Sequence, residues 1–144
     1  MSEAKPLAFH HEFPVLITEK HLDVFGHVNN AAYLQIFEEA RWDWITRNGF
    51  GLEQVRATGI GPVVLEATLR FKREALNRQR MVIRSRTLEY AGKLGRVEQL
   101  MQREDDGKTA CAAEFLVALF DLKARKMLRP TPEWLRAVGP VTAL

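Results

Sequence analysis

The pattern of hydrophobic and polar residues changes its period once along the chain. Between residues 30 and 48, apolar side chains recur at helical spacing with charged residues between them. Asn29 or Asn30 can cap the start of this segment, and Asn48-Gly49 supplies a stop signal. We therefore predict one long helix, whose repeating face consists of Tyr33, Leu34, Phe37, Arg41, Trp44 and Ile45.

Beyond Pro62 the period becomes two, which is typical of a strand with one buried face. The residues predicted to share this buried face are Val63, Leu65, Ala67, Leu69 and Phe71. Two more strands are predicted over residues 81–90 and 96–104. The strand that begins at Thr109 is apolar on both faces from Phe115 to Phe120, which predicts a central position in the sheet.

An earlier apolar run, residues 11–18, contains Pro14, which has no N–H to donate and therefore predicts a strand that lies at an edge or carries a bulge. The order strand, long helix, four strands predicts an α+β fold, in which the helix packs on a five-stranded antiparallel sheet. A short C-terminal helix follows Thr131-Pro132. We interpret residues 1–144 as a single domain with residues 1–10 as a frayed tail.

Composition restricts the class of protein. Hydrophobic residues make up 47% of the chain, no apolar run reaches the length of a membrane span, and the N-terminus lacks an apolar signal segment. Cys111 is the single cysteine, which excludes an internal disulfide and favours a cytoplasmic setting. The net charge of +3 is too small to indicate nucleic acid. Basic residues concentrate between Arg70 and Arg86, either to attract a phosphate-bearing ligand or as solvated strand faces.

Most residues with possible chemistry lie in HLDVFGHVNN, residues 21–30. No Ser, Cys or His triad can be assembled, Cys111 is expected in the core, and His10-His11 is not expected to bind a metal. Asp23 is the candidate catalytic carboxylate. Taken alone, the residue is more simply interpreted as a loop residue that bonds to a nearby N–H.

The pattern D-x-x-G-H-V-N-N-x-x-Y-L, followed by F-E-E-A-R on a helix and then four strands, resembles the hotdog-fold acyl-CoA thioesterases of the 4-hydroxybenzoyl-CoA thioesterase type. The resemblance extends from about Phe13 to Leu135. It implies hydrolysis of a fatty or aromatic acyl thioester of coenzyme A or acyl carrier protein. It also implies a homodimer or homotetramer with active sites between subunits, and no metal or dissociable cofactor. Neither a nucleic acid nor a membrane is expected as a partner.

The resemblance assigns roles within the loop. Asp23 is the catalytic carboxylate, as a general base that activates water or as a nucleophile that forms a mixed anhydride. The backbone N–H of Asn30 binds the oxyanion at the start of the helix, and Gly26 permits the tight turn before it. His27 is left between catalysis and bracing of the loop. Asn29 is assigned to the substrate site, with a loop brace or helix cap as its other role.

The expected substrate contacts include Tyr33 and Phe37 in an acyl pocket. Lys93 is a candidate phosphate contact across a subunit interface, although it could also be a plain exposed turn residue. Glu38 is the alternative base, because some hotdog thioesterases place their carboxylate on the helix. An ion pair between Glu38 and Arg41 is the simpler interpretation of that residue.

Two positions depart from the family pattern. His21 stands where members often have a second acidic residue, and Asn77-Arg78-Gln79 replaces a common Gly-Asp turn. Two alternatives therefore remain beside the thioesterase: a non-catalytic hotdog protein that binds acyl-CoA or acyl carrier protein, and an acyl-CoA hydratase using Asp23 and His27. The identity of the acyl group cannot be derived from the spacing.

Overall fold

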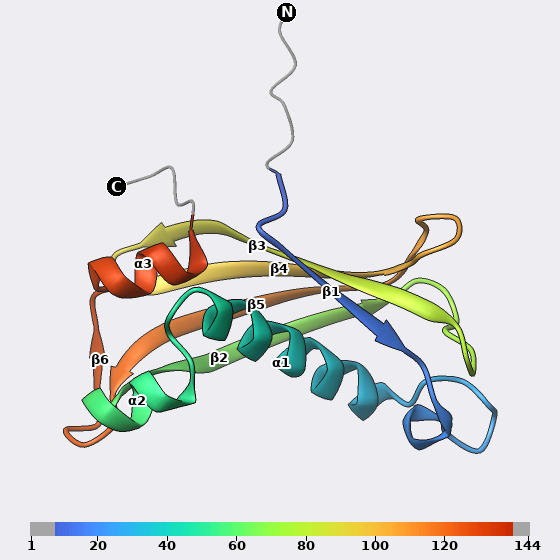
Figure 1. Ribbon diagram of the computed structural model, residues 1–144, viewed down its shortest axis with the longest axis horizontal. Coiled ribbons are helices and arrows are strands. Elements are labelled where there is room, and N and C mark those ends of the chain that lie inside the picture. Colours follow the sequence, from blue (N-terminus) through green and yellow to red (C-terminus); the bar gives the residue numbers. More distant parts are fainter. Residues whose placement is uncertain (1–7, 140–144) are drawn as a thin grey trace, which may run out of the picture.

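The computed structural model describes residues 8–139 and shows a curled antiparallel sheet with one long helix on its inner face (Figure 1). No helix among these residues is both long enough and apolar enough to cross a membrane. In chain order the elements are β1 (His11–Leu16), the 3-10 helix η1 (Glu19–His21), α1 (Asn30–Arg47), α2 (Leu52–Thr58), β2 (Ile60–Phe71), β3 (Arg80–Ala91), β4 (Leu94–Arg103), β5 (Thr109–Asp121), β6 (Lys126–Leu128) and α3 (Pro132–Val138).

The strand order in the sheet is β1-β3-β4-β5-β2, and every pairing is antiparallel. β1 and β2 form the two edges, which confirms the edge position predicted from Pro14. β5 lies between β4 and β2, as its apolar sequence predicted. The short β6 pairs with the end of β5, beyond the point where Gly95 of β4 lies opposite Val117. The predicted α+β hotdog arrangement, with its long helix and short C-terminal helix, is confirmed.

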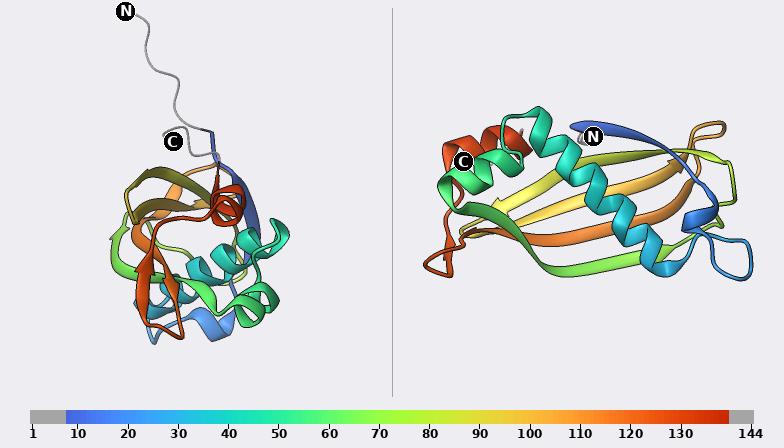
Figure 2. Two further views of the ribbon diagram at one scale, coloured as in Figure 1. Left: turned by 90° about the vertical axis from the view of Figure 1, so that its left-hand side faces the viewer. Right: turned by 60° about the horizontal axis from the view of Figure 1, so that its bottom comes forward.

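The long helix is packed unevenly. It buries Ala32, Tyr33, Ile36, Phe37, Ala40, Trp44 and Ile45. The helix contacts β1, β3 and α3. Asn48, the residue after the helix, donates from its side chain to the carbonyl oxygen of Ala137 in α3 (2.7 Å). The flank of α1 that faces β2 (Figure 2) is more open, because residues of α1 and β2 line a cavity there. Leu34, predicted to be buried, is 42% exposed on the helix surface.

The predicted face of β2 is wrong in its first half. The register against β5 shifts between Val64 and Glu66, so that Leu65 sits in a bulge without a β5 partner. A bulge inserts one residue and therefore reverses which side chains share a face. Val64 lies opposite Val117 and Ala67 opposite Phe115, and most of the strand is exposed rather than buried.

Three further expectations need correction. The helix α2 was not predicted, although Gly51 and Gly59 flank it and Gly59 takes the left-handed conformation that ends it (φ 72°). The short β6 was not predicted, and it adds a sixth strand to the five that were expected. The end of the predicted tail is not frayed. The backbone N–H of His10 donates to the carbonyl oxygen of Ser85 (2.8 Å), and the centre of the Phe9 ring lies 4.4 Å from the Arg86 guanidinium. The rest of the predicted tail, residues 1–7, lies outside the described residues.

Candidate active site

The loop before α1 is closed by its own backbone. Leu22 and Val28 form an isolated bridge, and the N–H of Asp23 donates to the carbonyl oxygen of His27 (2.9 Å). Inside this ring the N–H of Gly26 donates to the carbonyl oxygen of Asp23 (3.1 Å). Gly26 has φ 78°, a conformation that a residue with a side chain rarely adopts. The turn therefore needs glycine here, as the sequence predicted.

The two oxygens of the Asp23 carboxylate have different surroundings. Oδ1 accepts hydrogen bonds from the N–H groups of Phe25 (2.9 Å) and His27 (3.3 Å). Oδ2 has no hydrogen-bond partner within residues 8–139. The carboxylate is thus fixed through one oxygen, which is the loop role considered above, while the other oxygen is available to a substrate or to water.

The first turn of α1 leaves one amide unpaired. The Asn29 side chain caps the helix by accepting from the N–H of Ala31 (2.8 Å). Its carbonyl oxygen accepts from the N–H groups of Ala32 (3.0 Å) and Tyr33 (3.3 Å). The N–H of Asn30 has no partner in the described part of the chain. This donor lies at the positive end of the helix dipole, which suits it to stabilise an oxyanion.

Asp23 and Asn30 line one open cavity of about 330 Å³ at the N-terminal end of α1. Tyr33 and His27 also line it, so the structure brings together most of the predicted loop residues. The remaining lining comes from Val28 and from the end of β2 and the residues after it: Phe71, Lys72, Arg73 and Glu74. The ring of Phe71 lies 5.3 Å from that of Tyr33, and burial raises the pKa of Tyr33.

Sequence reasoning did not assign Lys72 and Arg73 to the site, although both belong to the basic cluster noted above. The backbone N–H groups of both residues donate to the carbonyl oxygen of Ala110 in β5. The Arg73 side chain also donates to the carbonyl oxygen of Thr109 (2.9 Å). These contacts hold two cationic side chains at the rim of the cavity, where they offset the charges of Asp23 and Glu74.

The imidazole of His27 lies beside Glu74 and not beside Asp23. Its Nε2 lies 3.4 Å from Oε2 of Glu74, while its backbone forms a bridge with Leu76 and donates to Asp23. The backbone of His27 therefore braces the loop. The position of its side chain at the cavity rim leaves a contact with substrate possible.

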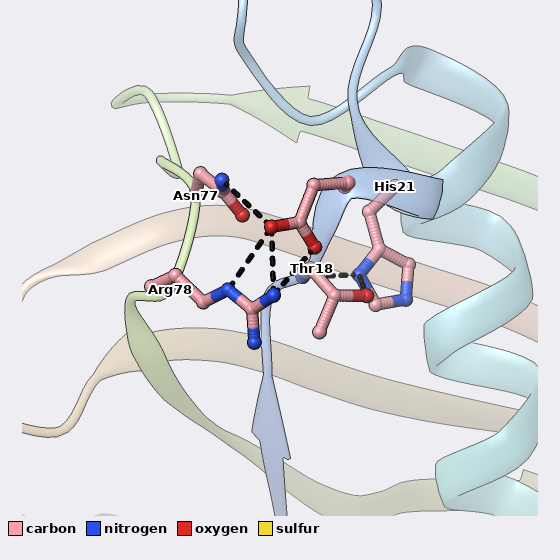
Figure 3. A network of polar contacts seen from close by, with 5 residues as sticks. Thr18, His21, Asn77 and Arg78 are labelled. Carbon is pink, nitrogen blue, oxygen red and sulfur yellow. Dashed lines mark hydrogen bonds and ion pairs between the residues drawn. The ribbon is translucent and has the colours of Figure 1, made fainter.

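Both departures from the family pattern lie in one polar network below the loop (Figure 3). Nδ1 of His21 accepts from the N–H of Thr18 (2.9 Å), which caps η1. The side chains of Asn77 (3.4 Å) and Arg78 (2.7 Å) donate to Oε1 of Glu19 in the same short helix. The residues that depart from the family pattern thus stabilise η1, and Asn77 and Arg78 join it to the segment before β3.

Other predicted residues lie elsewhere. Phe37 is fully buried edge-on against Phe115 and is not part of the lining of the loop cavity. Lys93 lies in the turn after β3, separated from the loop by the length of that strand, roughly 40 Å at 3.3 Å per residue. Within one chain Lys93 is therefore remote from Asp23. Glu38 lines a second cavity further along α1, and no ion pair joins it to Arg41, which instead donates to Gln99 (2.9 Å).

Comparison with known proteins shows the family to which this chain belongs. The profile of the thioesterase-like superfamily matches residues 17–138, a range that includes the loop, α1 and most of the sheet. The chain belongs to the thioesterase-like superfamily. The long-chain acyl-CoA thioesterase FadM of Escherichia coli strain K12 is 35% identical over 108 residues, which are 75% of this chain and 81% of FadM.

Solved structures agree with this membership. YbaW, described as a probable thioesterase from Escherichia coli, matches with a TM-score of 0.80 at 30% identity, over 90% of this chain and 100% of that chain. Slr0204, a 1,4-dihydroxy-2-naphthoyl-CoA thioesterase from Synechocystis, matches with a TM-score of 0.81 over 89% and 94% of the two chains, but its 16% identity supports the fold alone. The predicted hotdog fold and thioester hydrolase class are confirmed.

Proposed function

We propose that this member of the superfamily hydrolyses acyl-CoA thioesters at the loop cavity, with Asp23 as the catalytic carboxylate. The observation that carries the proposal is the pairing of Asp23 Oδ2 with the free N–H of Asn30 at one cavity. Hydrolysis of a thioester needs an attacking oxygen and a donor for the developing oxyanion, and these two groups supply both. The acyl-CoA thioesterase FadM is the relative whose activity supports this substrate class.

In the general-base route, Oδ2 takes a proton from a water molecule, which attacks the thioester carbonyl carbon. The negative charge moves to the carbonyl oxygen, where the Asn30 N–H stabilises it, and the thiolate then leaves as the carbonyl reforms. In the nucleophilic route, Oδ2 itself attacks the carbonyl carbon, the carbon–sulfur bond breaks and the thiolate leaves; water then hydrolyses the resulting mixed anhydride to the free acid and the Asp23 carboxylate. Both routes use the same free oxygen, since Oδ1 is held by the N–H groups of Phe25 and His27.

The basic residues at the rim extend the proposal to the coenzyme. Lys72 and Arg73 are the lysine and the arginine in the lining of the cavity that also contains Asp23 and Asn30. Charged donors of this kind bind phosphates strongly, Lys as a point charge and Arg as a fork. They favour coenzyme A, whose nucleotide carries several phosphates. The Lys93 contact predicted from the family can be made only by a second chain, because of its distance within one chain.

A second chain is part of the proposed enzyme. β2 is a twelve-residue edge strand, with Val64 (42%), Leu65 (38%) and Phe71 (53%) exposed along it. Such an edge favours pairing with another strand, and a two-fold axis would let β2 pair with its own copy. The same copy would cover the open flank of α1, where the candidate site lies. We infer a homodimer joined at β2, with a cytoplasmic location expected from the sequence.

Hydrolysis of a panel of acyl-CoA thioesters by the wild type and Asp23→Asn tests the proposal. Loss of the carboxylate should lower kcat/KM by about a hundredfold to ten-thousandfold. Asp105→Asn is the matched control, because Asp105 also accepts a backbone N–H in a turn (from Asp106, 2.7 Å) but lies between β4 and β5. The proposal fails if the wild type hydrolyses no thioester, or if Asp23→Asn retains the activity of Asp105→Asn.

Glu38→Gln tests the alternative base in the same assay. Glu38 lines the second cavity rather than the cavity of Asp23. We expect Glu38→Gln to retain hydrolysis of simple acyl groups. A loss equal to that of Asp23→Asn would transfer the base role to the helix.

A further inference from the structure

A second cavity lies between α1 and β2, beyond the loop cavity. It has a volume of about 320 Å³ and a mainly apolar lining that includes all three tryptophans of the chain: Trp42, Trp44 and Trp134. Along α1, Asn30 and Tyr33 line the first cavity, whereas Glu38 and Arg41 line the second. Along β2, Phe71 lines the first, whereas Pro62, Val63 and Val64 line the second.

The two cavities therefore follow each other along the same flank of the helix. From Asn30 to Arg41 the helix rises by roughly 16 Å, at 1.5 Å per residue. An acyl chain whose thioester lies at Asn30 can extend along α1 into the second cavity. An apolar cavity at that distance is suited to receive the far part of the acyl group.

A cation in this apolar lining is the unusual feature. Nη1 of Arg41 donates to Oε1 of Gln99 (2.9 Å), and the guanidinium lies 4.2 Å from the centre of the Phe115 ring. Gln99 is fully buried, and its amide nitrogen donates to Ser85 Oγ (3.0 Å) and to the carbonyl oxygen of Phe37 (3.1 Å). The contacts with Gln99 and Phe115 thus hold the guanidinium in one orientation. Burial lowers the pKa of Arg41 to about 10, with Glu38 opposing that shift, so the group stays charged at neutral pH.

Donors in this cavity lack acceptors. The other guanidinium nitrogens of Arg41 have no hydrogen-bond partner in residues 8–139, and no carboxylate of that range lies within ion-pair distance. These nitrogens are not among the buried unpaired atoms of the described residues, so an acceptor that enters the cavity can reach them.

We propose that Arg41 is a specificity-determining residue, whose free N–H groups bind an oxygen on the far part of the acyl chain. The inference rests on the proposed thioesterase function. The preferred oxygen is neutral, a hydroxyl or oxo group, because Glu38 lines the same cavity and repels a second carboxylate. A hydroxyl can in addition donate to Glu38. The enzyme then prefers oxygenated acyl groups to hydrocarbon chains of equal length.

The test compares acyl-CoA thioesters in matched sets, equal in chain length but ending in a methyl, a hydroxyl or a carboxylate group, over medium and long chains. For the length that reaches Arg41, we expect the wild type to show a kcat/KM roughly tenfold or more higher for the hydroxyl than for the methyl ending. In Arg41→Met, which keeps a side chain of similar shape, this ratio should fall to about one. Wild-type ratios of about one at every length would overturn the proposal.

The selectivity ratio separates recognition from support of the fold. If Arg41 only ties α1 to the sheet, Arg41→Met lowers activity on both endings equally, the ratio is unchanged, and the proposal is overturned. The same result is expected if Glu38 of a second copy occupies the cavity. Glu38→Gln supplies the opposite control: it should raise activity on the carboxylate ending relative to the methyl ending.

Intrinsic tryptophan fluorescence gives a readout that needs neither turnover nor a variant. Because every tryptophan of the chain lines the cavity, a ligand that enters it must change the emission. Titration of the wild type with a fatty acid and with its equal-length hydroxyl-terminated analogue should give a Kd roughly tenfold lower for the hydroxylated acid. Equal Kd values overturn the acyl-recognition role even when hydrolysis is intact. A preference without any thioester hydrolysis would instead reject only the proposed function.

Discussion

The two flanks of α1 differ in how completely they are covered. On one flank the helix meets β1 and β3, and His11 of β1 is hydrogen-bonded to Asp43 of α1 (2.8 Å). On the other flank lie both cavities, the exposed edge of β2, and unpaired donors on Asn30 and Arg41.

This difference indicates which flank of α1 contributes mainly to stability and which contributes mainly to function. The covered flank buries large apolar side chains of β3, such as Met81 and Ile83, which is what stabilises a fold. The open flank leaves unpaired donors for a substrate and an exposed strand for a second chain. Substitutions on the covered flank should therefore lower stability first, and substitutions on the open flank should lower activity first.

The largest effect on stability is expected at Ile83, a fully buried residue of β3 on the covered side. Ile83→Ala should lower the free energy of unfolding by about 2–5 kcal/mol, because it removes buried methyl groups and leaves a cavity. Urea denaturation measures this. Leu34→Ala is the matched control on α1, where the side chain is 42% exposed, and should cost less than about 1 kcal/mol. Equal losses for the two variants would contradict the comparison.

The edge of β2 gives the next largest effect, on assembly rather than folding. Leu65→Lys places a charge in the bulge. Because Leu65 has no paired residue in β5, the substitution should not disturb the pairing of β2 with β5 within one chain. A lysine on an edge strand opposes pairing with another strand. We expect the dimer dissociation constant to rise by about tenfold or more, measured by analytical ultracentrifugation, with activity falling as monomer accumulates.

Leu94→Lys is the control for this variant, since Leu94 is also 38% exposed but lies at the turn between β3 and β4. It should leave the association unchanged. Dissociation by Leu94→Lys but not by Leu65→Lys would place the interface elsewhere than β2.

A smaller effect is expected from two helix caps, of which only Asn29 lies beside the loop cavity. Asn29 caps α1 through the N–H of Ala31, and Thr131 caps α3 through the N–H of Trp134 (3.2 Å). Either residue changed to Ala should cost about 1 kcal/mol of stability. Only Asn29→Ala should also lower kcat, by roughly tenfold, because the freed Ala31 N–H and the loosened first turn disturb the Asn30 donor.

Thermal unfolding together with steady-state kinetics measures both properties of these two variants. A loss of kcat in Thr131→Ala as large as that in Asn29→Ala would show that general stability, rather than the local donor, controls the rate.

The sequence predicted α1 and the strands well because their signals are local. The helix was predicted over residues 30–48 and spans Asn30–Arg47, since Asn29 and Gly49 mark its ends. The alternating pattern failed at β2, because a bulge at Leu65 changes the facing residues without changing the composition. The helix α2 was missed although Gly51 and Gly59 flank it, as seven residues carry little periodic signal.

At the site, the sequence predicted the groups that belong to one short loop. Asp23, Gly26 and Asn30 are neighbours in the chain, so their convergence needed no knowledge of packing. Lys72 and Arg73 join them only because β2 pairs with β5 and ends beside the loop, which is a long-range contact. Arg41 was predicted as an ion-pair partner of Glu38, but its orientation depends on Gln99 in β4, far away in the sequence.

Cys111 gives the smallest expected effect and tests how well the covered core excludes reagents. The side chain is fully buried in β5, and burial raises the pKa of its thiol to about 12. Alkylation requires the thiolate, whose fraction rises with pH only as the thiol pKa is approached. The native protein should therefore resist iodoacetamide at neutral pH and remain protected up to about pH 10, whereas the protein in urea should react near pH 9, the ordinary range of a thiol. Mass spectrometry of the alkylated chain measures this. Rapid labelling of the native protein would show that the sheet opens at β5, and the contrast between a closed core and an open β2 flank would then be lost.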